Sequence, residues 1–125
     1  MRIKTALAAA LAAIALAACG GGSGGSGPSQ PAGSTKVVMT EFKFDPSSIS
    51  VKPGSATFFL VNSGSVPHDM VIIGPSGNRL AASELVQAGN SSAFTVSNLA
   101  AGSYTFICDQ PGHEASGMKG TLSVG

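Results

Sequence analysis

The residues best suited to chemistry in this chain lie together near its C-terminus, at positions 108–118. A thiol, an imidazole and a thioether follow one another there at C-x4-H-x4-M spacing, as Cys108, His113 and Met118. Thiolate and thioether sulfurs are soft ligands that suit Cu(I), whereas imidazole suits both oxidation states of copper. A structural zinc site would use more Cys or His ligands than this segment offers. The spacing therefore predicts a copper-binding loop.

A third strong ligand for this loop must come from elsewhere in the chain. The chain contains two histidines, and the other one is His68, which follows Pro67 at the start of an expected strand. Two loops at one end of a β-sandwich can meet. Two imidazoles, a thiolate and a weak axial thioether make up the trigonal site of blue-copper electron-transfer proteins. We therefore predict a site for one copper ion with the ligands His68, Cys108, His113 and Met118.

Each of these residues also has an ordinary structural interpretation. Free Cys is among the most buried residue types, and a His that follows Pro in a turn can be a surface or capping residue. Met39 and Met70 compete with Met118 for the axial position. Both fall within expected strands, however, where core packing is the default use of Met. The loop spacing therefore favours Met118.

Short strands separated by turns must position the two loops. The segments with strand-like alternation or with β-branched and aromatic composition are residues 36–44, 48–51, 56–61, 68–73, 91–96, 103–108 and 120–124. We expect 91–96 to pair with 103–108 or with a neighbouring strand. Helical composition is confined to residues 75–88, where the candidate inward side chains are Leu80, Leu85 and Val86. The pattern predicts an all-β Greek-key sandwich of about seven to eight strands with at most one short helix.

The composition agrees with a small β protein and limits its function. Of the 125 residues, 17 are Gly and 7 are Pro, and only 10% are charged. A single domain at residues 35–125 is too small to hold a second active domain, which disfavours a large enzyme. After the N-terminal leader the chain has five basic and six acidic residues, which argues against a nucleic-acid partner.

The N-terminus has the pattern of an export signal. Arg2 and Lys4 precede an apolar stretch that is too short to span a bilayer. The sequence LAAC at residues 16–19 resembles the lipobox of bacterial lipoproteins, in which the peptide is cut before Cys and the thiol is lipidated. An ordinary cleavage site with an incidental Cys is the alternative. We expect a lipoprotein signal peptide at residues 1–18 and a lipid anchor at Cys19.

The segment that follows the expected anchor resembles a flexible leash. Residues 20–34, GGGSGGSGPSQPAGS, have almost no side chain larger than Gln and therefore cannot bury apolar surface. We expect residues 19–34 to form the lipidated Cys and a disordered linker, and residues 35–125 to form the copper-binding domain. The protein would then be exported and held in the bacterial cell envelope, on the periplasmic side of a membrane or on the outer cell surface.

The domain resembles the cupredoxins, the azurin and plastocyanin family. Residues 108–113, with Pro and Gly before the His, are similar to the front of the azurin loop. Residues 113–120 and the Pro67-His68 pair are similar to plastocyanin. The resemblance implies a cupredoxin fold and a type 1 copper ion that cycles between Cu(I) and Cu(II). It also implies that electrons pass through the exposed edge of His113.

The chain departs from the family at Asp69, where plastocyanins and azurins usually have an Asn that ties the two ligand loops together. An ionised Asp69 would favour Cu(II) and lower the reduction potential, whereas a protonated or well-bonded one would replace the Asn. The backbone N–H groups of Asp69 and Gln110 are both expected to point at the Cys108 sulfur. Pro111 follows one position too late to remove the second donor.

The resemblance therefore implies a membrane-tethered electron carrier and not an enzyme. Its expected partners are redox proteins: cytochromes, an oxidase, a reductase or a photosynthetic complex. Contact with the membrane would be made through Cys19, and we expect a monomer. An envelope copper-binding or copper-delivery protein without a redox role is the main alternative. A second alternative is a metal-free adhesion module with the same sandwich fold, but the pattern of metal ligands disfavours it.

Overall fold

The computed structural model describes residues 27–125. The expected signal peptide and Cys19 lie outside this range, so their roles stay predictions. Among the described residues, no helix is long and apolar enough to cross a membrane.

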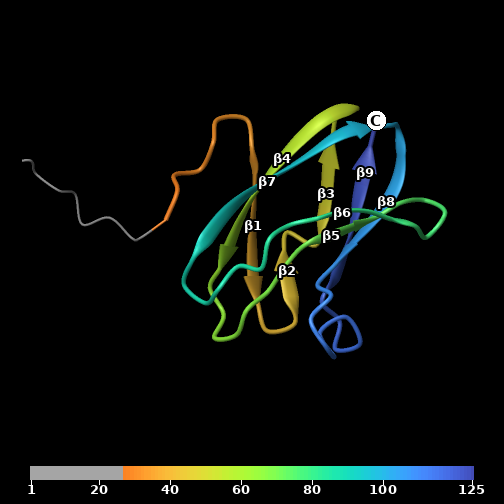
Figure 1. Cartoon of the computed structure of the whole chain (residues 1–125). Coiled ribbons are helices and arrows are strands. Elements are labelled where there is room, and N and C mark those ends of the chain that lie inside the picture. Colours follow the sequence, from red (N-terminus) through yellow and green to blue (C-terminus); the bar gives the residue numbers. More distant parts are fainter. Residues whose placement is uncertain (1–26) are drawn as a thin grey trace, which may run out of the picture.

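Nine strands form two sheets that pack face to face (Figure 1). The strands are β1 (Thr35–Thr40), β2 (Lys43–Asp45), β3 (Ser48–Val51), β4 (Gly54–Asn62), β5 (Val71–Ile73), β6 (Arg79–Ala82), β7 (Ser91–Leu99), β8 (Gly102–Ile107) and β9 (Lys119–Val124). One sheet has the order β2-β1-β4-β7 and the other the order β3-β9-β8-β5-β6. The β1–β4 and β3–β9 pairs are parallel, and the other pairs are antiparallel. The expected all-β sandwich is confirmed, with nine strands instead of seven to eight.

The strand expected at residues 36–44 is in fact two strands joined by a tight turn. Thr40 pairs with Lys43, so that only Glu41 and Phe42 connect β1 to β2. Phe42 has a φ of 56°, a left-handed conformation that is uncommon for a bulky side chain. The alternating pattern runs through the turn without Gly, Pro or Asn, which is why the sequence did not indicate it.

The pairing expected for residues 91–96 is resolved in favour of a neighbour. β7 pairs with β4 in one sheet, whereas β8 pairs with β5 and β9 in the other. Alternation alone identifies strands but not their partners, because the inward faces of both sheets follow the same period of two.

Residues 75–88 form no helix, which agrees with the expectation of at most one short helix. This segment contains β6, which pairs with β5 at the edge of its sheet. Leu80 and Leu85, expected to face inward, are 46% and 44% exposed, and only Val86 is buried. A helix of this length is marginal on its own, so pairing with β5 decides the conformation.

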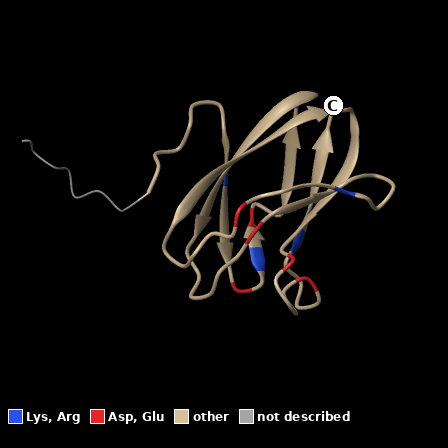
Figure 2. Cartoon of the chain, viewed as in Figure 1, with Lys and Arg blue, Asp and Glu red and all other residues tan. Residues whose placement is uncertain are grey.

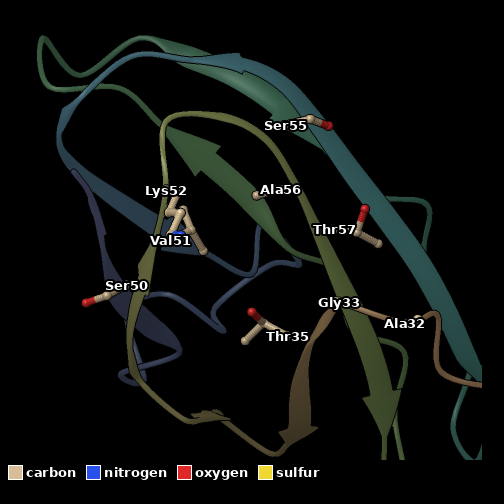
Figure 3. Close-up of a pocket in the computed structure, with 9 residues that line it drawn as sticks. All are labelled: Ala32, Gly33, Thr35, Ser50, Val51, Lys52, Ser55, Ala56 and Thr57. Carbon is tan, nitrogen blue, oxygen red and sulfur yellow. The ribbon is translucent and has the colours of Figure 1, made fainter.

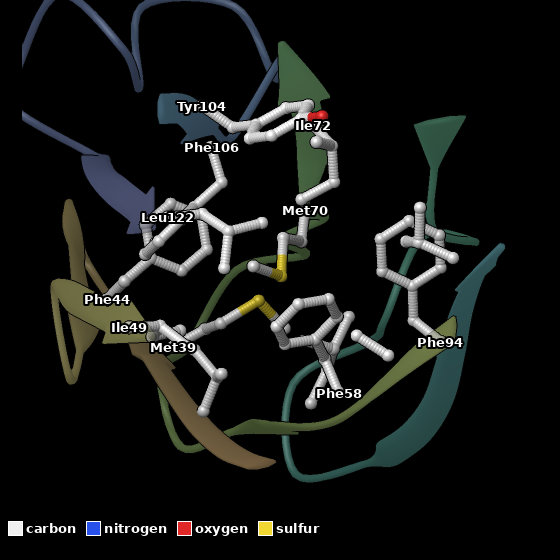
Figure 4. Packing of buried hydrophobic residues seen from close by; sticks show 14 of the residues in the cluster. Met39, Phe44, Ile49, Phe58, Met70, Ile72, Phe94, Tyr104, Phe106 and Leu122 are labelled. Carbon is white, nitrogen blue, oxygen red and sulfur yellow. The ribbon is translucent and has the colours of Figure 1, made fainter. Parts of the chain in front are cut away.

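The core lies between the two sheets (Figure 4). The Phe44 and Phe106 rings meet edge to face, with centroids 5.0 Å apart and planes at 81°. Met39 and Met70 are fully buried in this cluster, and Figure 4 shows their sulfurs turned toward one another. These two methionines therefore serve the packing of the sandwich, as their place in strands suggested.

Replacing Phe106 by Ala should destabilise the fold by about 3–5 kcal/mol, because it removes a fully buried ring that meets Phe44. Denaturant unfolding of the metal-free protein measures this change. Thr105→Ala, on the exposed face of the same strand, is the matched control and should change stability by less than about 0.5 kcal/mol. Equal effects of the two substitutions would contradict the assigned faces of β8.

Candidate metal centre

Three of the four predicted ligands converge at one end of the sandwich. The loops that carry them lie at the lower end of Figure 1, together with the turn between β1 and β2. His68 Nδ1 lies 3.2 Å from His113 Nδ1 and 3.9 Å from Cys108 Sγ. Cys108 Sγ lies 3.3 Å from His113 Nδ1. Two residues 45 positions apart in the chain thus present their ring nitrogens to the same sulfur.

This triangle of donor atoms has the size of a metal site. Its sides of 3.2, 3.3 and 3.9 Å place one point in its plane about 2 Å from all three atoms. Bonds of about 2.0–2.1 Å to nitrogen and about 2.3 Å to sulfur are normal for zinc, a first-row metal ion. Two imidazoles and one thiol form the donor set of blue-copper sites. The residues present therefore fit copper.

Backbone hydrogen bonds close the loop between Cys108 and Met118. The alternation of β8 continues one residue past its end, so Cys108 is buried on the same face as Phe106. The Cys108 N–H donates to the Met118 carbonyl at 3.1 Å, and the Met118 N–H donates to the His113 carbonyl at 3.0 Å. Met118 is fully buried. The three predicted ligands of this loop are thus linked directly through their own backbones.

His68 is positioned by a short bridge to Val86. The two residues exchange backbone hydrogen bonds of 3.1 and 2.8 Å. The buried Asn62 amide donates to the carbonyls of Val66 and Val86 at 2.9 and 2.8 Å, which ties the loop before His68 to the same segment. Sequence reasoning did not identify Asn62. Its place at the end of a buried strand, before a Ser-Gly turn, was the available signal.

Asp69 joins the two ligand loops. Its Oδ1 atom accepts a hydrogen bond of 2.9 Å from the N–H of Asp109, the residue after Cys108. Burial raises the pKa of the Asp69 carboxyl, and the Asp109 side chain adds to the rise. The pKa of Asp109 is lowered by its hydrogen bond with Asp69 and by Arg79, whose Nη1 lies 2.8 Å from Asp109 Oδ2. This chain therefore connects its ligand loops through an Asp side chain.

The surroundings of the donor atoms set their protonation. Burial raises the pKa of the Cys108 thiol to about 11, against the lowering effect of backbone hydrogen bonds from Asp69 and Gln110. These are the two amides that were expected to face the sulfur. Burial also lowers the pKa of His68, which keeps its imidazole neutral and its lone pair available at neutral pH. A metal ion that binds here must displace the thiol proton.

Glu41 and Phe42 in the β1–β2 turn also reach the site, and sequence reasoning missed both. Glu41 Oε1 lies 3.3 Å from His68 Nε2, the nitrogen that faces away from Cys108. Its hydrogen bond with the Ser65 amide lowers the pKa of the Glu41 carboxyl. The Phe42 ring meets the His113 ring nearly edge-on, with centroids 5.1 Å apart and planes at 71°.

A surface pocket elsewhere on the domain is separate from this site (Figure 3). It lies at the start of β1 and along the connection from β3 to β4, and Thr35, Ser50, Lys52 and Thr57 are among its lining residues. β1 runs from this pocket to the turn that touches His68, so the pocket lies at the opposite end of the strand. It contains none of the predicted ligands.

Comparison with known proteins agrees with this geometry. The model of a family described as copper binding proteins, plastocyanin/azurin family, matches residues 31–125. Plastocyanin of Scenedesmus fuscus is 30% identical over 87 residues, which are 65% of this chain and 85% of that protein. Auracyanin-B of Chloroflexus aurantiacus is 47% identical over 47 residues, which are 38% of this chain. The match spans only 20% of the length of Auracyanin-B.

The fold has relatives among solved structures as well. The crystal structure of dithionite-reduced auracyanin from the photosynthetic bacterium Roseiflexus castenholzii aligns with a TM-score of 0.67. The alignment covers 77% of this chain and 99% of that one, at 23% sequence identity. At this identity the likeness concerns the fold alone.

Zn²⁺ should release about one proton when it binds the metal-free protein near pH 8, because the Cys108 thiol is still protonated there and must lose its proton to the metal. Zinc is a suitable probe since it has no redox chemistry with the thiol. Calorimetric titration in two buffers of different ionisation enthalpy counts the protons. Cys108→Ser should abolish the release, and binding without proton release in the unsubstituted protein would contradict thiolate ligation.

Proposed function

Because the chain belongs to the plastocyanin/azurin family of copper-binding proteins, we propose that it carries single electrons on one type 1 copper ion. The proposed ligands are His68, Cys108, His113 and Met118. The observation that carries the proposal is the buried triangle of two imidazole nitrogens and one sulfur, none more than 3.9 Å apart. Copper, when bound, supplies a one-electron couple between Cu(I) and Cu(II).

The protein keeps its ligands in place while the electron moves. Cu(I) and Cu(II) prefer different geometries, and a site whose ligands move little between them loses little energy to rearrangement. The backbone bonds between Cys108, Met118 and His113 resist such movement, and so does the Asp69 side chain bonded to the neighbouring loop. The rigid sandwich beneath them supports both loops.

The burial of the site favours a carrier over an enzyme. The side chains of His68, Cys108 and Met118 are all 0% exposed, which excludes water from most of the space around the donor atoms. An enzyme that uses its metal needs an open coordination position for substrate or water. Four protein ligands in a closed pocket leave none.

The half-buried His113 ring is the proposed route for electrons. Phe42 and Val66, which are 40% and 36% exposed, give apolar side chains to the same end of the molecule. Figure 2 shows that charges are sparse over the sheets and that acidic positions lie on the β1–β2 turn and on the loop between β8 and β9. A small face that combines apolar and acidic side chains suits short-lived docking with a redox partner. A cytochrome, an oxidase, a reductase or a photosynthetic complex would be such a partner.

We further propose that the carrier acts as a monomer on a lipid tether in the bacterial cell envelope. The support is the lipobox-like sequence that ends at Cys19 and the Gly- and Ser-rich segment after it. A Gly- and Ser-rich linker would let the domain turn toward partners while it remains held at the membrane.

Electrochemistry separates the carrier from a copper-delivery protein. The copper-loaded domain should give a rapid, reversible one-electron wave and should retain its copper when a Cu(I) chelator is added. Both results follow from a buried site with closely held ligands. A slow or irreversible wave, with rapid loss of Cu(I) to the chelator, would favour delivery and contradict the proposed role.

A further inference from the structure

The outer nitrogen of His68 faces a carboxylate that comes from a third loop. Glu41 Oε1 lies 2.7 Å from the Ser65 amide nitrogen, 3.2 Å from that of Val66 and 3.3 Å from His68 Nε2. One oxygen atom therefore faces three nitrogens, two of them in the loop before His68 and the third in the His68 ring itself. This contact links the β1–β2 turn to the predicted ligand.

The neighbouring backbone is arranged to admit this carboxylate. The Ser63 N–H donates to the Met39 carbonyl at 2.9 Å, which holds the loop after β4 against the end of β1. A Cβ atom at Gly64 would collide with Glu41 Oε1, so a side chain there would push the carboxylate out of its present position. The positive φ of Phe42 completes the turn that holds Glu41 there.

The hydrogen bond defines the proton position on His68. A carboxylate oxygen offers only lone pairs, so the proton in this bond must belong to His68 Nε2. Nδ1 then has a free lone pair on the side of Cys108 Sγ, which is the state that a metal ligand requires. Because the His68 ring is fully buried, its orientation depends on protein groups and not on solvent.

Phe42, the next residue of the same turn, contacts the second imidazole, that of His113. Its ring touches His113 edge-on, while the adjacent Glu41 touches His68. Two consecutive residues therefore contact the outer sides of both predicted histidine ligands. The β1–β2 turn acts as a third loop of the site, although it supplies no donor atom to the metal.

We propose that Glu41 is the positioning residue of this site, fixing the tautomer and orientation of His68 and stabilising Cu(II) relative to Cu(I) through its negative charge. The redox part of this proposal rests on the proposed copper function, whereas the tautomer part does not. Carboxylates that accept a hydrogen bond from the ring N–H of a histidine ligand are known to orient that ligand and to raise its basicity. A merely structural role for Glu41, as acceptor of the two loop amides, is the alternative.

The first test is the reduction potential of Glu41→Gln. The Gln side chain keeps an oxygen that can accept the same hydrogen bonds but loses the charge. At a fixed solution potential, the ratio of Cu(I) to Cu(II) should rise about threefold to tenfold, where tenfold corresponds to about 59 mV. Glu114→Gln is the matched control: it removes one charge from the exposed residue after His113 and should change the ratio less than about twofold. Equal shifts in the two variants would overturn the electrostatic role.

The second test uses metal-free protein and so does not depend on copper chemistry. Nitrogen-15 NMR of the histidine rings should show His68 as the Nε2–H tautomer with slow exchange of that proton. In Glu41→Ala the tautomers should mix and exchange should accelerate, while the amide spectrum of the β8–β9 pair remains native. A His68 tautomer and exchange rate that match those of the unsubstituted protein would overturn the positioning role. If Glu41→Ala does not fold, the isosteric Glu41→Gln comparison still decides the charge effect.

Discussion

The structure depends on holding two imidazole nitrogens and one sulfur against one another, with only the His113 ring partly open to solvent. His68 Nδ1, His113 Nδ1 and Cys108 Sγ lie within 3.9 Å, in a site where His68 and Cys108 are fully buried. A thiol and two ring nitrogens held this close lose contact with water and gain at most weak hydrogen bonds with one another, so a flexible chain would separate them. The surrounding hydrogen bonds must therefore supply the order that the donor atoms do not.

The two ligand loops are held in place because backbone hydrogen bonds of the sheet type continue into them beyond the ends of the strands. The β8–β9 ladder extends by one more hydrogen bond, from Cys108 to Met118. In the same sheet, the His68–Val86 bridge lies beyond the end of the β5–β6 pair. Asp69 then connects the two loops through the Asp109 amide. The site is thus joined directly to the strands of the sandwich. The packed core, which includes the contact between Phe44 and Phe106, supports it.

The sequence predicted those features that depend on residues close together in the chain. Cys108, His113 and Met118 lie within one loop, so their spacing alone indicated a site, and His68 followed because the chain has one other histidine. The β-sandwich followed from alternation and turns. The contribution of Asp69 as a link between loops was one of two outcomes left open, and the structure shows the hydrogen bond.

The missed features depend on contacts between distant segments. Glu41 and Phe42 looked like part of a continuous strand, because the alternation of side chains passes through their turn unchanged. Their proximity to His68 and His113 follows from the pairing of β1 with β4, which no local pattern reports. Residues 75–88 likewise contain a strand in place of a helix, because β6 pairs with β5.

In the proposed site, Cys108 donates its sulfur to a copper ion flanked by two imidazoles. Visible absorption and electron paramagnetic resonance of the copper-loaded domain test it most directly, because a thiolate–copper bond produces an intense charge-transfer band and a distinctive Cu(II) spectrum. The proposed ligands predict a strongly blue oxidised protein that becomes colourless on reduction, and a folded Cys108→Ser variant without the colour. An oxidised protein that binds copper but is colourless, or a Cys108→Ser variant that stays blue, would contradict it.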